Sequence, residues 1–272
     1  MKSGIRWVGV IALVMSLGQA IAGEPAMTAL PKMVDRAAEY GRQAAFVFDL
    51  DETLVDSSER RYESLLDVLA QVCAPEVSRH PDCDALQDLR LTDLYRLQNR
   101  YDIGAYLRHG GARDGAFIAE LESRSFDVYL SGRYIVDKDH LFVGAQAFVK
   151  ALKREGAEVY FVSSRSLERQ ERGTLEFLMA RGLLRPGEEG NLYLKPDSER
   201  SPDFKRRATL EIADRVADQG GHVFGIFENE PENLAIWIEN FPRARAFFVD
   251  VAYQHEGPVA SKAVIVERDF RY

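Results

Sequence analysis

The stretch Phe46-Val47-Phe48-Asp49-Leu50-Asp51-Glu52-Thr53 decides how the rest of the chain is interpreted. Together with the two alanines before it, it begins as a continuous apolar run of five residues. Such a run is typical of a strand that is covered on both faces, as in a parallel sheet. Ligands of open parallel sheets bind outside the carboxyl ends of the strands. Asp49 and Asp51 therefore stand where a site is expected.

Beyond residue 140 the sequence alternates between predicted strands and predicted helices. We predict strands at residues 158–162, 191–194, 222–227 and 245–249. We predict helices at residues 31–42, 143–154, 167–183, 202–218 and 231–240. This alternation indicates an α/β fold, a three-layer α/β/α, Rossmann-like parallel sheet with helices on both faces.

Residues 57–140 differ from the sequence on either side because they are rich in charged residues and helix formers. Five apolar or aromatic positions recur at helical spacing, namely Tyr62, Leu65, Leu66, Leu69 and Val72. Residues 86–97 suggest a second helix with weaker phase. We interpret residues 57–140 as a helical cap that is inserted after the first strand. The core is then formed by residues 23–56 and 141–272.

Polar residues at several predicted strand ends suit phosphoryl transfer. A carboxylate such as Asp49 can attack phosphorus and form an aspartyl-phosphate, and Asp51 can act as general acid and base. Ser163 follows the second strand, and Lys205 lies in the helix before the fourth; both can hold phosphate oxygens. Attack of an anion on an anion needs a cation, and Mg²⁺ suits oxygen ligands.

The first of these segments, residues 46–55, resembles the D-x-D-x-T signature of the haloacid dehalogenase superfamily. The resemblance implies that Asp49 is the nucleophile and a Mg²⁺ ligand. It implies that Asp51 is the general acid and base, with its backbone carbonyl on the metal. We place Thr53, the last residue of the signature, among the phosphate-binding residues. A carboxylate at position 51 is typical of phosphatases rather than of the dehalogenase branch.

Later segments resemble the other motifs of the same superfamily. Residues 159–165 are similar to the second motif, which implies that Ser163 binds phosphate. Lys205 stands where the third-motif lysine is expected, with Lys195 as the alternative. Residues 225–228 resemble the fourth motif, which implies that Glu228 binds the metal.

The fourth motif departs from the family pattern. Glu228 and Glu232 stand where the family usually has aspartates, and Asn229 could share the metal. A glutamate is longer by one methylene, and Mg²⁺ requires near-ideal geometry. The alternative is therefore a catalytically degenerate site. Arg165 could contact a substrate phosphate or pair with an acidic neighbour.

The net charge and the N-terminal sequence limit the expected partners and the expected location. The formal net charge is -8, so nucleic acid is not an expected partner, whereas a small phosphorylated substrate is. Residues 1–22 predict a signal peptide with cleavage near Ala22, because a positive start, a short apolar run and an A-x-A exit follow one another. We therefore expect a periplasmic or secreted protein with no stable membrane anchor after cleavage. Cys73 and Cys83 can form a disulfide there, or remain two buried thiols.

Together these features predict a Mg²⁺-dependent phosphomonoesterase that acts on small phosphorylated metabolites outside the cytoplasm. The resemblance is to the secreted, acid-phosphatase-like branch of the superfamily. The alternatives are an exported binding protein on the same fold without turnover, and a phosphotransferase of that fold. The sequence indicates neither the substrate nor the oligomeric state.

Overall fold

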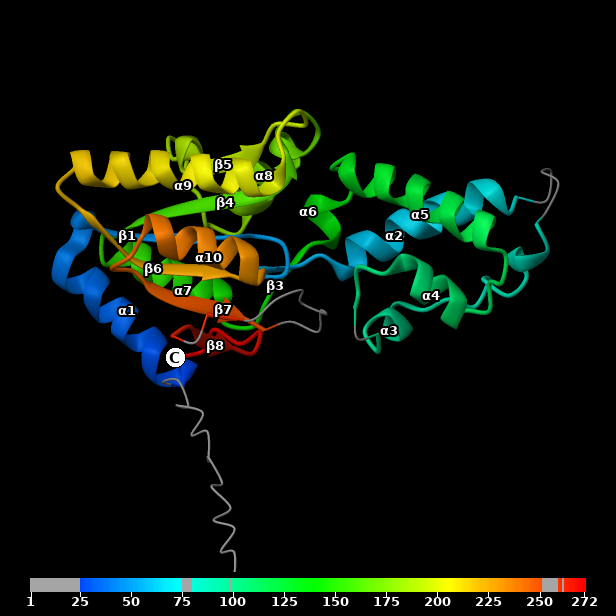
Figure 1. Ribbon diagram of the computed structural model, residues 1–272, viewed down its shortest axis with the longest axis horizontal. Helices are drawn as coiled ribbons and strands as arrows, with labels where there is room; N and C mark the ends of the chain where they lie inside the picture. The colour runs from blue at the N-terminus through cyan, green and yellow to red at the C-terminus, as the bar shows by residue number, and fades with distance from the viewer. Residues whose placement is uncertain (1–24, 75–79, 98, 251–258, 261) are drawn as a thin grey trace, which may run out of the picture.

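The described part of the protein comprises two units, an α/β core and a helical cap (Figure 1). The structure, a computed structural model, describes residues 25–74, 80–97, 99–250, 259–260 and 262–272. The predicted signal peptide, residues 1–22, lies outside this range. Within it, none of the helices is both long enough and apolar enough to cross a membrane.

The core contains a sheet of six strands in the order β5-β4-β1-β6-β7-β8, and all neighbouring pairs are parallel. The strands are β1 (Ala44–Phe48), β4 (Glu158–Ser166), β5 (Leu192–Lys195), β6 (His222–Glu228), β7 (Arg245–Val249) and β8 (Val264–Val266). The predicted α/β fold with a parallel sheet is confirmed. The sequence did not predict β8, because three residues are too short to show a period.

Helices cover both faces of this sheet, because β1 is apolar on both sides. Phe46 and Phe48 pack on one face, with α1 (Ala26–Tyr40), α7 (Ala145–Arg154) and α8 (Leu167–Ala180). Ala45 and Val47 pack on the other, with α9 (Ser201–Asp218) and α10 (Pro231–Asn240). Side chains of a strand alternate between faces, so one continuous apolar run supplies two cores.

Several predicted boundaries in the core were wrong, and two of them differ from the structure by four residues or more. The first helix was predicted to begin at residue 31, but α1 begins at Ala26 and Pro31 lies inside it. The second strand was predicted to end at residue 162, but β4 continues to Ser166. The extra residues are polar, and a strand that ends in a site has no need of further apolar side chains.

The cap consists of α2 (Ser58–Val72), α3 (Leu91–Leu94), α4 (Ile103–His109), α5 (Gly115–Leu130) and α6 (Ile135–Lys138), with a 3-10 turn, η2 (Pro81–Cys83). The predicted helix at residues 86–97 was wrong, since only the single turn α3 forms there. Leu86, Leu89 and Leu94 are nevertheless buried in the cap core. Their spacing therefore reported burial and not a continuous helix.

One link joins the cap to the core, and another stabilises the cap itself. A short antiparallel pair, β2 (Val55–Asp56) with β3 (His140–Leu141), joins it to the core beside the carboxyl end of β1 (Figure 1). Within the cap, a disulfide between Cys73 and Cys83 ties the end of α2 to η2. Of the two alternatives for these cysteines, the structure shows the bonded one.

Candidate active site

Asp49 and Asp51 follow β1, which lies between β4 on one side and β6 on the other. The chain passes from β1 to β4 and β5 on one side and then returns to β6 on the other, so this is the switch point of the sheet. The Asp49 amide donates a hydrogen bond to the Phe227 carbonyl at 2.9 Å, which anchors the start of the loop to β6. The loop then turns tightly, since the amides of Leu54 and Val55 both donate to the Leu50 carbonyl at 2.9 Å. This turn holds both aspartates over the strand ends.

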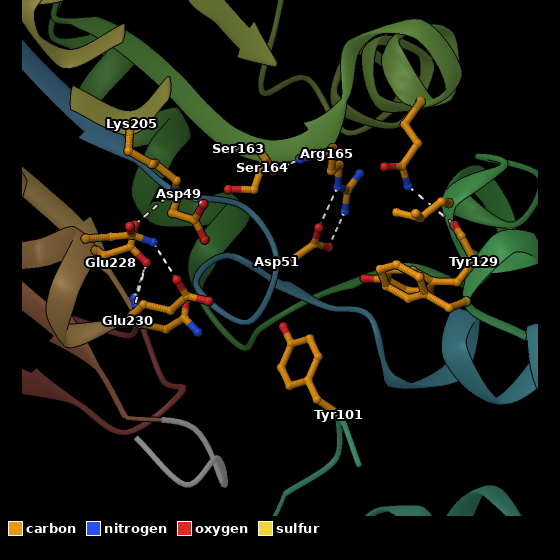
Figure 2. Close-up of a pocket in the computed structure, with 15 residues that line it drawn as sticks. Asp49, Asp51, Tyr101, Tyr129, Ser163, Ser164, Arg165, Lys205, Glu228 and Glu230 are labelled. Carbon is orange, nitrogen blue, oxygen red and sulfur yellow. Dashed lines mark hydrogen bonds and ion pairs between the residues drawn. The ribbon is translucent and has the colours of Figure 1, made fainter. Parts of the chain in front are cut away.

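Lys205 occupies the space between two carboxylates. Its ammonium group, on the fully buried face of α9, donates to Asp49 Oδ1 at 2.5 Å and to Glu228 Oε2 at 3.0 Å (Figure 2). It also donates to the Val162 carbonyl at 2.9 Å. The nucleophile candidate, the fourth-motif glutamate and the lysine therefore form one buried cluster. Lys195, the alternative lysine, donates instead to the carbonyls of Pro196 and Glu199, in the loop after β5.

Burial affects the carboxylates of this cluster strongly. Burial, together with the charge of Asp49, raises the pKa of Glu228 to about 8, although the Lys205 ammonium opposes the shift. Burial also raises the pKa of Asp49 above its ordinary value, against the same ammonium group. Two buried carboxylates face one ammonium, so a further cation would stabilise their ionised forms.

Asp51 is held by two arginines. Arg165 donates to its carboxylate through Nε at 2.9 Å and Nη2 at 2.7 Å, and Arg60 donates through Nη2 at 2.8 Å (Figure 2 shows the Arg165 contacts). Burial alone would raise the pKa of Asp51, but the charges of Arg165 and Arg60 outweigh burial and lower it well below the ordinary range. For Asp51 to donate a proton, at least one of these guanidinium groups must move away.

Asp139, which lies between α6 and β3, completes this network. Its buried carboxylate contacts Arg165 Nη2 at 2.7 Å and Arg60 Nε at 3.1 Å. We call the four residues Asp51, Arg60, Asp139 and Arg165 the arginine clamp. Arg60 comes from cap helix α2 and Arg165 from core strand β4, so the clamp joins the two units beside the reaction site. Arg165 thus pairs with acidic neighbours, one of the two expectations for it.

Thr53 is positioned differently from its prediction as a phosphate-binding residue. Its side chain is fully buried and is not part of the cavity wall described below. Its hydroxyl lies 3.1 Å from Asp49 Oδ2 and 3.0 Å from the Asn229 side chain. The physical reason is the tight turn, which points Thr53 under the loop. Thr53 therefore positions Asp49 rather than facing a substrate.

Three oxygens surround one end of the Asn229 amide, and oxygen atoms are the ligands that Mg²⁺ prefers in proteins. This end of the amide lies 3.0 Å from Thr53 Oγ1, 3.1 Å from Glu228 Oε1 and 3.2 Å from the Asp51 carbonyl oxygen. With the nitrogen at that end, all three oxygens accept hydrogen bonds.

A site at this place would depend on mixed ligands. Among the described residues, no three Asp, Glu, His or Cys side chains are arranged to hold a metal ion. The Asn229 amide and the Asp51 main-chain carbonyl would therefore join Asp49 and Glu228. Glu232, the other glutamate of the fourth motif, is exposed on the first turn of α10 and lies outside the cavity wall.

A cavity of about 180 Å³ brings the predicted side chains together. Its wall includes Asp49, Asp51, Ser163, Lys205 and Glu228, which come from four separate segments of the chain. The aromatic part of the wall, formed by Tyr101, Phe126 and Tyr129 of the cap, could not be predicted from the sequence. Nothing in their spacing distinguished them from core residues of helices and loops.

Several solved structures are similar to this chain. The chain is similar in fold to a predicted phosphoglycolate phosphatase from Haemophilus somnus, with 15% identity over 84% of this chain and 94% of that one and a TM-score of 0.46. It is similar to CbbY from Rhodobacter sphaeroides, solved in complex with phosphate, with 15% identity, coverages of 84% and 94% and a TM-score of 0.45.

A third similar structure is a HAD family hydrolase from Deinococcus radiodurans with bound phosphate and sodium. It shows 21% identity over 77% of this chain and 81% of that chain, with a TM-score of 0.41. A comparison with curated proteins found no match. The family model of haloacid dehalogenase-like hydrolases matches residues 43–208, which is more than half of the chain and contains Asp49, Ser163 and Lys205. The chain therefore belongs to the haloacid dehalogenase-like hydrolases.

Proposed function

We propose that the protein is a Mg²⁺-dependent phosphomonoesterase that acts through an aspartyl-phosphate on Asp49. The observation that supports this most is the single cavity whose wall includes Asp49, Asp51, Ser163, Lys205 and Glu228. A carboxylate nucleophile, a second carboxylate, a hydroxyl and an ammonium group are the parts that phosphoryl transfer on an aspartate needs.

In the first step an Asp49 oxygen attacks phosphorus, and the bond from phosphorus to the alcohol oxygen breaks. Asp51, once it is released from part of the arginine clamp and has taken up a proton from solvent, gives that proton to the departing alcohol. The substrate phosphate can favour that release, because as an anion it competes with Asp51 for the guanidinium groups. Lys205 and Ser163 hold the phosphoryl oxygens.

In the second step Asp51 takes a proton from water, which attacks phosphorus. The bond between phosphorus and Asp49 breaks, and inorganic phosphate leaves. Asp49, the Asp51 carbonyl, Glu228 and Asn229 would hold Mg²⁺. When bound, the ion neutralises phosphoryl charge and lets one anion approach another.

We also propose that the protein acts outside the cytoplasm on small phosphorylated metabolites, as in the secreted, acid-phosphatase-like branch. The signal-like sequence of residues 1–22 and the Cys73–Cys83 disulfide support this location, because structural disulfides persist in oxidising compartments. The clamped Asp51 favours a second candidate, an exported binding protein without turnover.

Hydrolysis of p-nitrophenyl phosphate separates the two candidates. We expect phosphate release with Mg²⁺, its loss with a chelator and its return when Mg²⁺ is restored in excess. Asp49→Asn should abolish turnover while the thermal unfolding midpoint stays within a few degrees. Asp218→Asn, the same substitution at the exposed end of α9, is the matched control. Turnover in Asp49→Asn at the wild-type rate would refute the mechanism.

A further inference from the structure

The cap contains a second cavity that adjoins the reaction cavity. Its volume is about 440 Å³, and every residue of its wall belongs to the cap. The two cavities share Tyr101, Phe126 and Tyr129, so the same three rings form part of both walls. Figure 2 shows Tyr101 and Tyr129 on the side of Asp51 away from Lys205 and Glu228. The cap cavity therefore begins where the leaving group of a phosphate ester would lie.

The walls of the cap cavity are mainly aromatic and apolar. Phe126 stacks on Tyr129 with ring centroids 6.2 Å apart, and Ile103 adds an aliphatic surface. Phe126 is nevertheless 57% exposed, although it lies on α5 among buried neighbours. Volumes of roughly 300–1,000 Å³ with aromatic walls are typical of sites for organic ligands. A ligand that covers an exposed ring removes apolar surface from water, which makes binding more favourable.

The charged groups of this cavity already have partners inside the protein. The Arg61 guanidinium lies over the rings of Tyr101, at 3.9 Å, and Tyr129, at 4.9 Å. Glu122 accepts a hydrogen bond from the Gly104 amide at 2.9 Å. One positive and one negative side chain remain nearly balanced, so the cavity does not favour a second phosphate or another strongly charged group.

The geometry points to a leaving-group subsite that selects phosphate monoesters whose alcohol contains a planar aromatic ring. The phosphoryl group would lie beside Asp49 and Lys205, the ester oxygen near Asp51, and the ring against Phe126, Tyr129 and the aliphatic wall. This inference rests on the proposed phosphatase function and names the substrate class of that same site. The ring could belong to a nucleoside or to a simple arylalkyl alcohol.

Two pairs of esters test the inference, because the members of each pair share a primary-alcohol leaving group and differ in the ring. One pair is adenosine 5′-monophosphate and ribose 5-phosphate, and the other is 2-phenylethyl phosphate and ethyl phosphate. We expect kcat/KM to be about tenfold or more higher for the ring-bearing member, mainly through KM. A preference in the first pair alone identifies a nucleoside, and a preference in both, or in the second alone, identifies any aryl group of suitable size.

Substitution of Phe126 tests the site itself. Phe126→Ala should raise KM for the ring-bearing esters by about tenfold and change kcat/KM for ribose 5-phosphate by much less. Phe126→Tyr retains the ring and should retain the preference. Leu210→Ala, on the exposed face of α9, is the control for loss of a large exposed side chain and should not change kcat/KM for either ester of a pair. Equal kcat/KM within both pairs, or an unchanged preference in Phe126→Ala, would overturn the inference.

Failure of the proposed function is distinguishable from failure of this inference. If no ester is hydrolysed, the phosphatase proposal fails, and calorimetry with adenosine and 2-phenylethanol then decides on the subsite alone. Binding of either alcohol to the wild type, weakened about tenfold or more in Phe126→Ala, supports the subsite. No binding, or equal binding to both proteins, overturns it.

Discussion

At the scale of single residues, Lys205 explains how two buried carboxylates can lie side by side. Its ammonium group contacts both Asp49 and Glu228. Lys205 itself lies on α9, and its whole side chain is buried. The ring of Trp237 lies 4.9 Å from the same nitrogen and adds a cation–π contact. The site is thus stabilised by one cation before any metal or substrate arrives.

Glu52 allows a test of electrostatics in the same loop. Its carboxylate is buried and accepts hydrogen bonds from the Ser57 amide at 3.2 Å and hydroxyl at 2.9 Å. Burial, with a smaller contribution from Asp56, raises the pKa of Glu52 to about 7, although Arg61 opposes the shift. The folded state therefore binds this proton more tightly than the unfolded state does.

The sign of the effect on stability follows from that difference. The contribution of protonated Glu52 is fully present below its unfolded pKa of about 4.5, and it is lost as the pH rises to about 7. Glu52→Gln keeps an acceptor for Ser57 and has no such titration. We expect the wild type to lose on the order of 3 kcal/mol relative to Glu52→Gln between pH 4.5 and pH 8.

Urea unfolding of both proteins in the presence of a chelator measures this difference across the pH range. The chelator keeps added metal from changing the titration. Parallel stability profiles for the wild type and Glu52→Gln would show that burial does not raise the pKa of this carboxyl.

The sequence predicted part of the site because strand ends are readable. Asp49 and Glu228 follow apolar runs, and Ser163 follows a third, so the convergence of parallel strands places them together. Arg60 and Asp139 could not be predicted in the same way. In sequence they look like solvated charges of a helix and a loop, and only the approach of α2 to β4 buries them.

At the scale of elements, the arginine clamp should stabilise the link between cap and core. Asp139→Asn leaves Arg60 and Arg165 with Asp51 as their one remaining carboxylate, in a buried setting. Removal of one partner from a buried ionic network typically costs about 3–5 kcal/mol. We expect a loss of about 3 kcal/mol in the free energy of unfolding, measured by chemical denaturation.

The short helix α6 and the residue after it offer a matched control for this substitution. Asp137→Asn makes the same chemical change two residues earlier, where the side chain is exposed. It should change stability by no more than about 0.5 kcal/mol. Equal effects of the two substitutions would mean that the clamp does not stabilise the fold.

The disulfide should stabilise the cap in particular. Cys73 and Cys83 are 10 residues apart in the chain, and opening a loop of that length is expected to cost about 2–3 kcal/mol. The double substitution Cys73→Ser and Cys83→Ser should lower the unfolding midpoint and make the α2–η2 region more susceptible to proteolysis. A reducing agent should lower the midpoint of the wild type by the same amount and leave the double variant unchanged. If the reducing agent has no effect on the wild type, the bond does not contribute.

The elements differ in how well the sequence predicted them. The strands β1, β6 and β7 are each at least five residues long, and their apolar runs are bounded by polar or turn residues, so they can be recognised in the sequence. The pair β2 and β3 has two residues in each strand, which is too short to show any period. In the cap, Leu86 and Leu89 face the core from turns, so helical spacing alone was misleading there.

At the scale of the whole molecule, core and cap contribute different side chains to two adjoining cavities. The core supplies the groups that would act on phosphorus, and the cap supplies the aromatic wall beyond Asp51. The cap is linked to the core beside the carboxyl end of β1 (Figure 1), and its Arg60 contacts Asp51 of the core loop.

The proposed mechanism requires that Asp49 becomes covalently phosphorylated during turnover. The most direct measurement is acid quenching of the wild-type protein during steady-state hydrolysis of p-nitrophenyl phosphate with Mg²⁺, followed by peptide mass spectrometry. We predict that the peptide containing Asp49 gains the mass of one phosphoryl group, and that Asp49→Asn shows neither this gain nor hydrolysis. Steady hydrolysis without phosphorylation of Asp49, or with phosphorylation of another residue, would contradict the account.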